Sequence, residues 1–342
     1  MIKDSVFAAL ELANERRAER RRFLKLASAG AAAAGGLGLL SACGSDNNDN
    51  TPTPTPSPTP TSTASGVSTD VGILQLALNL EYLEAQFYSI AAFGRRLPDA
   101  SLTGAVGTRG DVTGGRKVEF ADPVIASYAR EIAGDEIAHV TALRAVLTAA
   151  GSTLVIAQPA INIDGGATGA FTAAAQAAGV VASGQTFDPY ASDENFLLAA
   201  FLFEDLGVTA YKGASPLITS ATYLEAAAGI LAAEAYHAGL IRTELFNLGL
   251  DARAKANKLS AARDLLDGTG TRDGPLATAD ANGALTVADL VPADSNSIAY
   301  SRSSAQVHNI AYLTTSAKVG GGFFPAGTNN SIEALRTSGA TA

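Results

Sequence analysis

The stretch DEIAH at residues 135–139 decides the fold, because AEAYH at residues 233–237 repeats its pattern. Each stretch contains Glu-x-x-His, first as Glu136 and His139 and again as Glu234 and His237. A spacing of three residues puts both side chains on one face of a helix. The chain of 342 residues has only three histidines, and two of them lie in this motif. The repetition therefore predicts two long helices that turn the same side chains toward a shared core.

A second pair of predicted helices adds two more carboxylates. Glu81 is followed seven residues later by Tyr88, and Glu204 is followed seven residues later by Tyr211. Seven residues are nearly two helical turns, so each glutamate shares a helix face with its tyrosine. Both glutamates follow apolar stretches, which predicts that they face the core of the protein. The chain thus carries two copies of Glu-x6-Tyr followed by Glu-x-x-His.

The spacing of apolar residues, helix caps and glycines predicts four long helices, at residues 69–93, 122–150, 192–212 and 217–248. Only residues 213–216 separate the last two helices, so these should form an antiparallel hairpin. The longest connection, residues 152–191, lies between the second and third helices. That length predicts an all-α four-helix bundle whose second and third helices are joined by a long crossover.

Four carboxylates buried in one core would repel each other, and each would be costly to remove from water. Two divalent cations would neutralise the four carboxylates, and one neutral imidazole would act as a further ligand to each cation. A carboxylate-rich site suits iron or manganese better than copper. The sequence therefore predicts two Fe or Mn ions. Without metal, some of the carboxylates should bind protons well above the ordinary glutamate pKa of about 4.3.

This arrangement resembles the di-metal carboxylate bundles, in which a Glu from each of two helices joins a Glu-x-x-His from each of the other two. The resemblance implies that Glu136 and Glu234 bridge the ions and that Glu81 and Glu204 are terminal ligands. Tyr88 and Tyr211 then either donate hydrogen bonds to the ligands or are ordinary core residues.

Two further residues near the motifs have roles that the sequence leaves open. Asp135 could orient a ligand histidine, but the equivalent residue of the other motif is Ala233, which leaves one histidine needing a different partner. Glu84 competes with Glu81 as a ligand but has no tyrosine seven residues later. We therefore expect Glu84 to be a surface residue or a supporting neighbour of the ligands.

The sequence is also similar to ferritin-like domain proteins related to desiccation-associated proteins. The similar segments are residues 78–85 (LNLEYLEA), 187–190 (FDPY), 203–211 (FEDLGVTAY) and 321–325 (GGFFP). The resemblance implies a ferritin-like bundle at residues 69–250, and the remaining residues, 251–342, form a C-terminal extension expected to pack on it.

The N-terminal residues resemble an export signal. RRRFLK at residues 20–25 is similar to a twin-arginine motif with the pair Arg20 and Arg21, and LSAC at residues 40–43 is similar to a lipoprotein cleavage site. The resemblance implies that residues 1–42 are removed and that Cys43 carries the lipid. Residues 43–68, rich in Thr and Pro, should then form a linker. We expect a chain anchored to the outer face of a membrane.

Composition narrows the function further. A formal net charge of −9 argues against a nucleic-acid partner. No haem of the bacterioferritin type, which bridges two subunits, is expected, because the only methionine is Met1 in the predicted signal. One hypothesis is a di-metal oxidoreductase of ferroxidase or catalase type that meets a small oxidant, O2 or peroxide. The other is a structural desiccation or stress protein with a vestigial or purely stabilising metal site. A homodimer stays open, whereas a ferritin cage is not expected because the extension and the anchor would obstruct it.

Overall fold

Four long helices form the body of the protein, of which this computed structural model describes residues 66–268 and 270–339. They are α2 (Thr69–Phe93), α3 (Pro123–Ala150), α5 (Asp193–Ala214) and α6 (Ala221–Asn247). The predicted mostly helical bundle is confirmed, and the long helices begin and end within four residues of the predicted bounds. The largest difference is the start of α6, because a 3-10 turn (Ser215–Leu217) precedes it and Ser220 caps it.

Side chains fix where each long helix begins. The hydroxyl groups of Ser68, Ser192 and Ser220 accept hydrogen bonds from backbone N–H groups in the first turns of α2, α5 and α6. Asp122 does the same for α3. These caps satisfy N–H groups that have no partner inside the helix. The ends of the helices, and hence the register of their central residues, are therefore set locally by the sequence.

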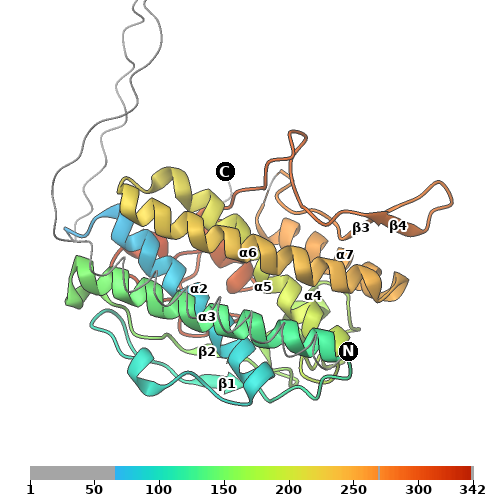
Figure 1. Ribbon diagram of the computed structural model, residues 1–342, viewed down its shortest axis with the longest axis horizontal. Helices are drawn as coiled ribbons and strands as arrows, with labels where there is room; N and C mark the ends of the chain where they lie inside the picture. Colours follow the sequence, from blue (N-terminus) through green and yellow to red (C-terminus); the bar gives the residue numbers. More distant parts are fainter. Residues whose placement is uncertain (1–65, 269, 340–342) are drawn as a thin grey trace, which may run out of the picture. The chain divides into compact units, whose positions relative to one another are not determined.

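The helices pack as two antiparallel pairs, α2 with α3 and α5 with α6 (Figure 1). The crossover from α3 to α5 contains β2 (Ile161–Ile163) and α4 (Ala170–Ala177). Strand β2 pairs in parallel with β1 (Val112–Gly114), which lies in the connection between α2 and α3. The sequence did not predict these strands, which are only three residues long.

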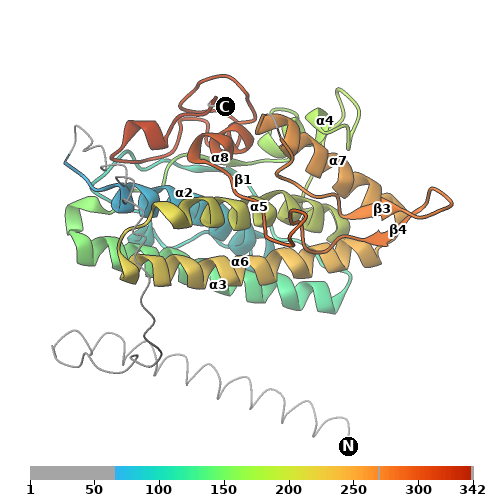
Figure 2. The same ribbon diagram turned by 90° about the horizontal axis from the view of Figure 1, so that it is seen from above.

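Helices α2 and α5 form the middle layer of the molecule (Figure 2). On one side of them lie α3 and α6. On the other lie α4, α7 (Leu250–Leu266) and α8 (Ser304–Ala311). Residues 70–92 of α2 and 196–211 of α5 are all buried, as expected for helices that are covered on every side. Any polar residue in the centre of these two helices is therefore enclosed by protein.

The C-terminal residues contact both central helices. The side-chain amide of Asn79 on α2 donates to the backbone oxygen of Asn329, and Arg302 donates from its side chain to Thr209 on α5. A two-stranded antiparallel sheet, β3 (Ala277–Ala279) and β4 (Leu285–Ala288), lies between α7 and α8 in the sequence. Within the described residues, no helix is long and apolar enough to cross a membrane.

Candidate metal centre

All six predicted ligands lie near the middle of the four long helices. Glu81 is on α2, Glu204 is on α5, and the two Glu-x-x-His motifs are on α3 and α6. The four glutamates have no exposed surface, and His139 and His237 are 9% and 5% exposed. The structure thus brings together, inside the bundle, side chains that lie up to 156 positions apart in the sequence.

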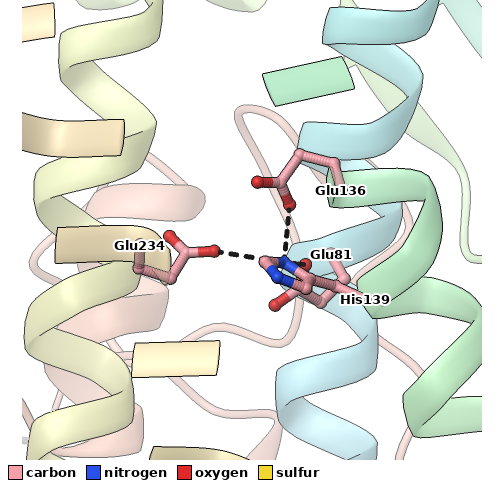
Figure 3. Close-up of side chains that lie close together, drawn as sticks. All are labelled: Glu81, Glu136, His139 and Glu234. Atoms are coloured by element: carbon pink, nitrogen blue, oxygen red, sulfur yellow. Dashed lines mark hydrogen bonds and ion pairs between the residues drawn. The ribbon is translucent and has the colours of Figure 1, made fainter. Parts of the chain in front are cut away.

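The six side chains form two overlapping groups of four (Figure 3 shows the first). The first group is Glu81, Glu136, His139 and Glu234, and the second is Glu136, Glu204, Glu234 and His237. In each group, one ligand atom per residue lies within 4.8 Å of the others. Glu136 and Glu234 belong to both groups, and they are the two residues for which the resemblance to di-metal bundles implies a bridging role.

Each histidine points its Nδ1 atom at the carboxylates. His139 Nδ1 lies 3.1 Å from Glu81 Oε2, 3.4 Å from Glu136 Oε2 and 3.7 Å from Glu234 Oε1. His237 Nδ1 lies 3.0 Å from Glu136 Oε1 and 3.5 Å from Glu204 Oε2, without the alignment of a hydrogen bond. Both imidazoles therefore present a potential ligand atom to the centre of the cluster.

The two tyrosines contact the glutamates of the opposite helix. Tyr211 on α5 donates a hydrogen bond of 2.5 Å to Glu81 Oε1 on α2, and Tyr88 on α2 donates one to Glu204 Oε1 on α5. The exchange is possible because α2 and α5 are antiparallel at this level. Each hydrogen bond restrains a carboxylate whose other oxygen faces a histidine.

Asp135 lies beside the histidine of the other motif, not beside its own. Its Oδ2 atom is 3.3 Å from His237 Nε2, so it can hold that ring with Nδ1 turned inward. The equivalent neighbour of His139 would come from residue 233, which is alanine. The asymmetry noted in the sequence thus makes the surroundings of the two histidines different.

The cluster contains nearly all of the unpaired buried polar atoms of the described residues. Apart from Asp267 Oδ1, every buried side-chain nitrogen or oxygen without a hydrogen-bond partner belongs to Glu84, Glu136, Glu204, Glu234 or His237. Buried polar groups are normally paired, and leaving one unpaired is costly. Carboxylate oxygens and an imidazole nitrogen are donor atoms for iron or manganese. The residues present therefore fit a pair of such ions.

The electrostatics of the cluster differ between the two shared glutamates. Burial, followed by the neighbouring carboxylates Glu84 and Glu136, raises the pKa of Glu234 well above its ordinary value. Burial also disfavours the charge on Glu136, but its contacts with His139 and His237 outweigh burial and lower its pKa. The expectation that buried carboxylates bind protons therefore holds for Glu234 but not for Glu136, because both histidines face Glu136.

The sequence expectation for Glu84 was incomplete. Glu84 is 4% exposed and belongs to the buried interior rather than the surface. Burial and the nearby charge of Glu136, then of Glu81 and Glu204, raise its pKa well above the ordinary value. The available signal was its position three residues after Glu81, which puts both carboxylates on the same face of a helix.

A buried ion-pair network behind Glu204 was also missed. Asp205 accepts hydrogen bonds from Arg242 on α6 and from Arg263 on α7, and both arginines are buried. These contacts tie the central part of α5 to its neighbours.

The third histidine, His308, contacts Ser304 O and Thr328 Oγ1 in the C-terminal residues and takes no part in the cluster.

Comparison with known proteins gives three results. A family model described as a ferritin-like domain matches residues 69–247, which contain all six clustered residues. The chain is 30% identical over 244 residues to the desiccation-related protein PCC13-62 of Craterostigma plantagineum, covering 68% of this chain and 74% of that protein. It is 26% identical over 273 residues to the ferritin-like catalase Nec2 of Nesocodon mauritianus, covering 77% of this chain and 84% of that protein. No solved structure gave a significant match.

Proposed function

Because the chain belongs to the ferritin-like domain family, we propose that its bundle binds two Fe or Mn ions and uses them to break down hydrogen peroxide. The observation that carries this proposal is the pair of overlapping ligand groups that share Glu136 and Glu234. The name of one relative, a ferritin-like catalase, favours peroxide as the substrate class. Two redox-active ions held side by side would give two electrons to one molecule of peroxide, which is reduced to water. They would regain two electrons from a second molecule of peroxide, which is oxidised to O2.

Each residue of the site has a definite task in this proposal. Glu136 and Glu234 would be shared by the two ions, Glu81 and His139 would complete the ligands of one, and Glu204 and His237 would complete those of the other. The hydrogen bonds from Tyr211 and Tyr88 hold Glu81 and Glu204 in place. Asp135 fixes the ring of His237 and can accept its Nε2 proton.

The histidine side of the site supports access by a small oxidant. The side chains of His139 and His237 are 11% and 7% exposed, whereas those of the four glutamates are at most 1% exposed. Asp135, beside His237, is 38% exposed. A small polar molecule such as peroxide would therefore approach from the side of His139, His237 and Asp135.

Oxygen release measures the proposed reaction directly. Protein loaded with Mn(II) or Fe(II) should release one O2 for every two H2O2 consumed, as recorded with an oxygen electrode. Glu136→Gln should lower the rate by about 100-fold or more, because even supporting residues around a metal typically contribute 10- to 100-fold. Glu225→Gln, on the exposed surface of α6, is the matched control and should keep the full rate.

Two other outcomes would contradict the catalase proposal. Repeated Fe(II) oxidation that consumes O2, without O2 release from peroxide, would identify a ferroxidase. Protein that holds two ions but carries out neither reaction would favour the second function, a structural stress protein with a stabilising metal site. The similarity to a desiccation-related protein is the observation that favours this alternative.

We also propose that the bundle is exported and anchored by lipid at Cys43. The residues concerned, Arg20, Arg21 and Cys43, lie outside the described part of the structure. Replacing both arginines with lysine should leave precursor in the cytoplasm, and Cys43→Ala should give unlipidated, soluble protein. Fatty-acid labelling that persists in the Cys43→Ala variant would show that this assignment is wrong.

A further inference from the structure

Helices α2 and α5 are two copies of one functional unit. Each carries a glutamate that faces the cluster and, seven residues later, a tyrosine that donates to the glutamate of the other helix. The crossed contacts relate the two helices by an approximate twofold axis. On the side formed by α2 and α5, the metal position beside Glu81 and the one beside Glu204 should therefore have similar surroundings.

This symmetry breaks three residues after each glutamate. On α2 the residue at that place is Glu84, and on α5 it is Gly207. A spacing of three residues puts both positions on the helix face that bears the ligands. One side of the centre therefore has an additional carboxylate, and the other side has no side chain at all.

Glycine at position 207 leaves room for the carboxylate of Glu234, and Glu84 lies next to it. A Cβ atom there would lie 2.2 Å from Glu234 Oε2, so that carboxylate would have to move, and 3.5 Å from Glu84 Oε1, which is an ordinary contact. One oxygen of each carboxylate, Glu84 Oε1 and Glu234 Oε2, thus lies beside the α5 backbone at Gly207. After burial, the charge of Glu84 is also the largest cause of the raised pKa of Glu234.

Glu84 has no structural partner that explains its burial. Its Oε2 atom accepts no hydrogen bond within the described residues, although the side chain is 4% exposed. A charged carboxylate in a protein interior is strongly unfavourable unless a proton or a cation neutralises it. Apart from His237, the nearby charged groups are carboxylates, those of Glu136, Glu81, Glu204 and Glu234. A bound cation would supply the missing partner.

Glu84 borders the two ligand groups without belonging to either, and we propose that it is a fifth carboxylate ligand, which would turn toward one of the two metal ions from the side that faces Gly207. The inference rests on the metal centre proposed above. Four carboxylates already balance two divalent ions, so a fifth adds a negative charge that favours tighter binding and a higher metal charge. Because Gly207 occupies the equivalent place on α5, only one of the two metal positions gains this ligand. The two ions are therefore bound with unequal affinity.

Calorimetric titration of the metal-free protein with Mn(II) tests this assignment. Wild-type protein should bind in two steps. Glu84→Gln, which keeps the size of the side chain but removes its charge, should weaken one step by about tenfold or more and leave the other unchanged. Electron paramagnetic resonance of the half-loaded and fully loaded protein gives a second readout that does not depend on activity. Glu225→Gln is the surface control.

Glu84→Asp separates a ligand from a nearby charge. It retains the carboxylate but shortens its reach by one methylene, so a ligand should lose affinity at the same step. If the Glu84→Asp variant binds both ions as wild type does, charge alone matters and the ligand assignment is overturned. Wild-type constants for Glu84→Gln also overturn it. Wild-type protein that binds no metal would instead contradict the proposed function itself, so the two failures are distinguishable.

Discussion

Metal-free protein should lose stability steadily as the pH rises from roughly 5 to 8, and bound metal should remove this dependence. The reason is the cluster of buried carboxylates. Burial, the first cause, raises the pKa of Glu81 to about 7 in the folded state and also raises the pKa values of Glu84, Glu204 and Glu234. Each of these groups binds a proton more readily in the folded than in the unfolded chain.

The sign follows from where the protons are bound. The carboxylates with raised pKa values stabilise the folded state fully at pH values below 4.5, the pKa in the unfolded chain. This stabilisation is lost as the pH rises through the pKa values of the folded state, about 7 in the case of Glu81. His139 acts in the same direction. Burial opposes its charge, but Glu81 and Glu136 outweigh burial and raise its pKa to about 12. Its contribution to stability therefore declines as the pH rises above the unfolded value of 6.5. Each extra proton held by the folded state lowers the unfolding free energy by about 1.4 kcal/mol per pH unit.

Two variants of the shared glutamates should respond in opposite ways. Glu234→Gln removes a carboxylate that is unfavourable when charged, so it should stabilise the metal-free protein at neutral pH. Glu136→Gln removes the negative charge that lies between the two histidines, so it should destabilise that form by roughly 3 kcal/mol. Both variants should weaken metal binding, because each removes a ligand common to the two groups.

Urea midpoints at several pH values, with and without Mn(II) or Fe(II), provide the measurement. Metal should flatten the wild-type curve, since the cations take the place of the protons and bind only the folded state. Glu225→Gln should reproduce the wild-type curves. Parallel shifts for Glu136→Gln and Glu234→Gln in the metal-free form would show that the histidines do not distinguish the two carboxylates.

The ligand set could be read from the sequence because its members repeat at fixed helical spacings. Glu-x-x-His and Glu-x6-Tyr each occur twice, so the pairs support each other although no single match is specific. Helix periodicity and capping serines then placed the motifs at similar depths. The difference between Asp135 and Ala233 was equally visible, since it needs only a comparison of the two motifs.

The remaining features depend on which helices touch, and local spacing does not contain that information. The contact between Asp135 and His237, rather than His139, follows from the packing of α3 against α6. The lowered pKa of Glu136 requires both histidines to meet at one carboxylate. The spacing of three residues placed Glu84 on the same face as Glu81, but its neighbours on another helix, Gly207 and Glu234, could be found only from the structure.

The other large effect concerns the metal itself. Glu136 and Glu234 belong to both ligand groups, so the loss of either should affect both ions and not only one. A Glu136→Gln variant should therefore retain little metal after desalting, whereas Glu84→Gln should retain at least one ion per chain. Loss of a single ion from Glu136→Gln would show that the two groups do not share this ligand.

The number of ions per chain tests the central claim most directly. Protein purified without chelator from its native host, and the same protein reconstituted with Fe(II) or Mn(II), should be assayed by elemental analysis against protein concentration. We expect about two Fe or Mn ions per chain, as the paired ligand groups require. Less than about half an equivalent after reconstitution would contradict the metal centre, because a preformed buried site of this kind binds metal strongly.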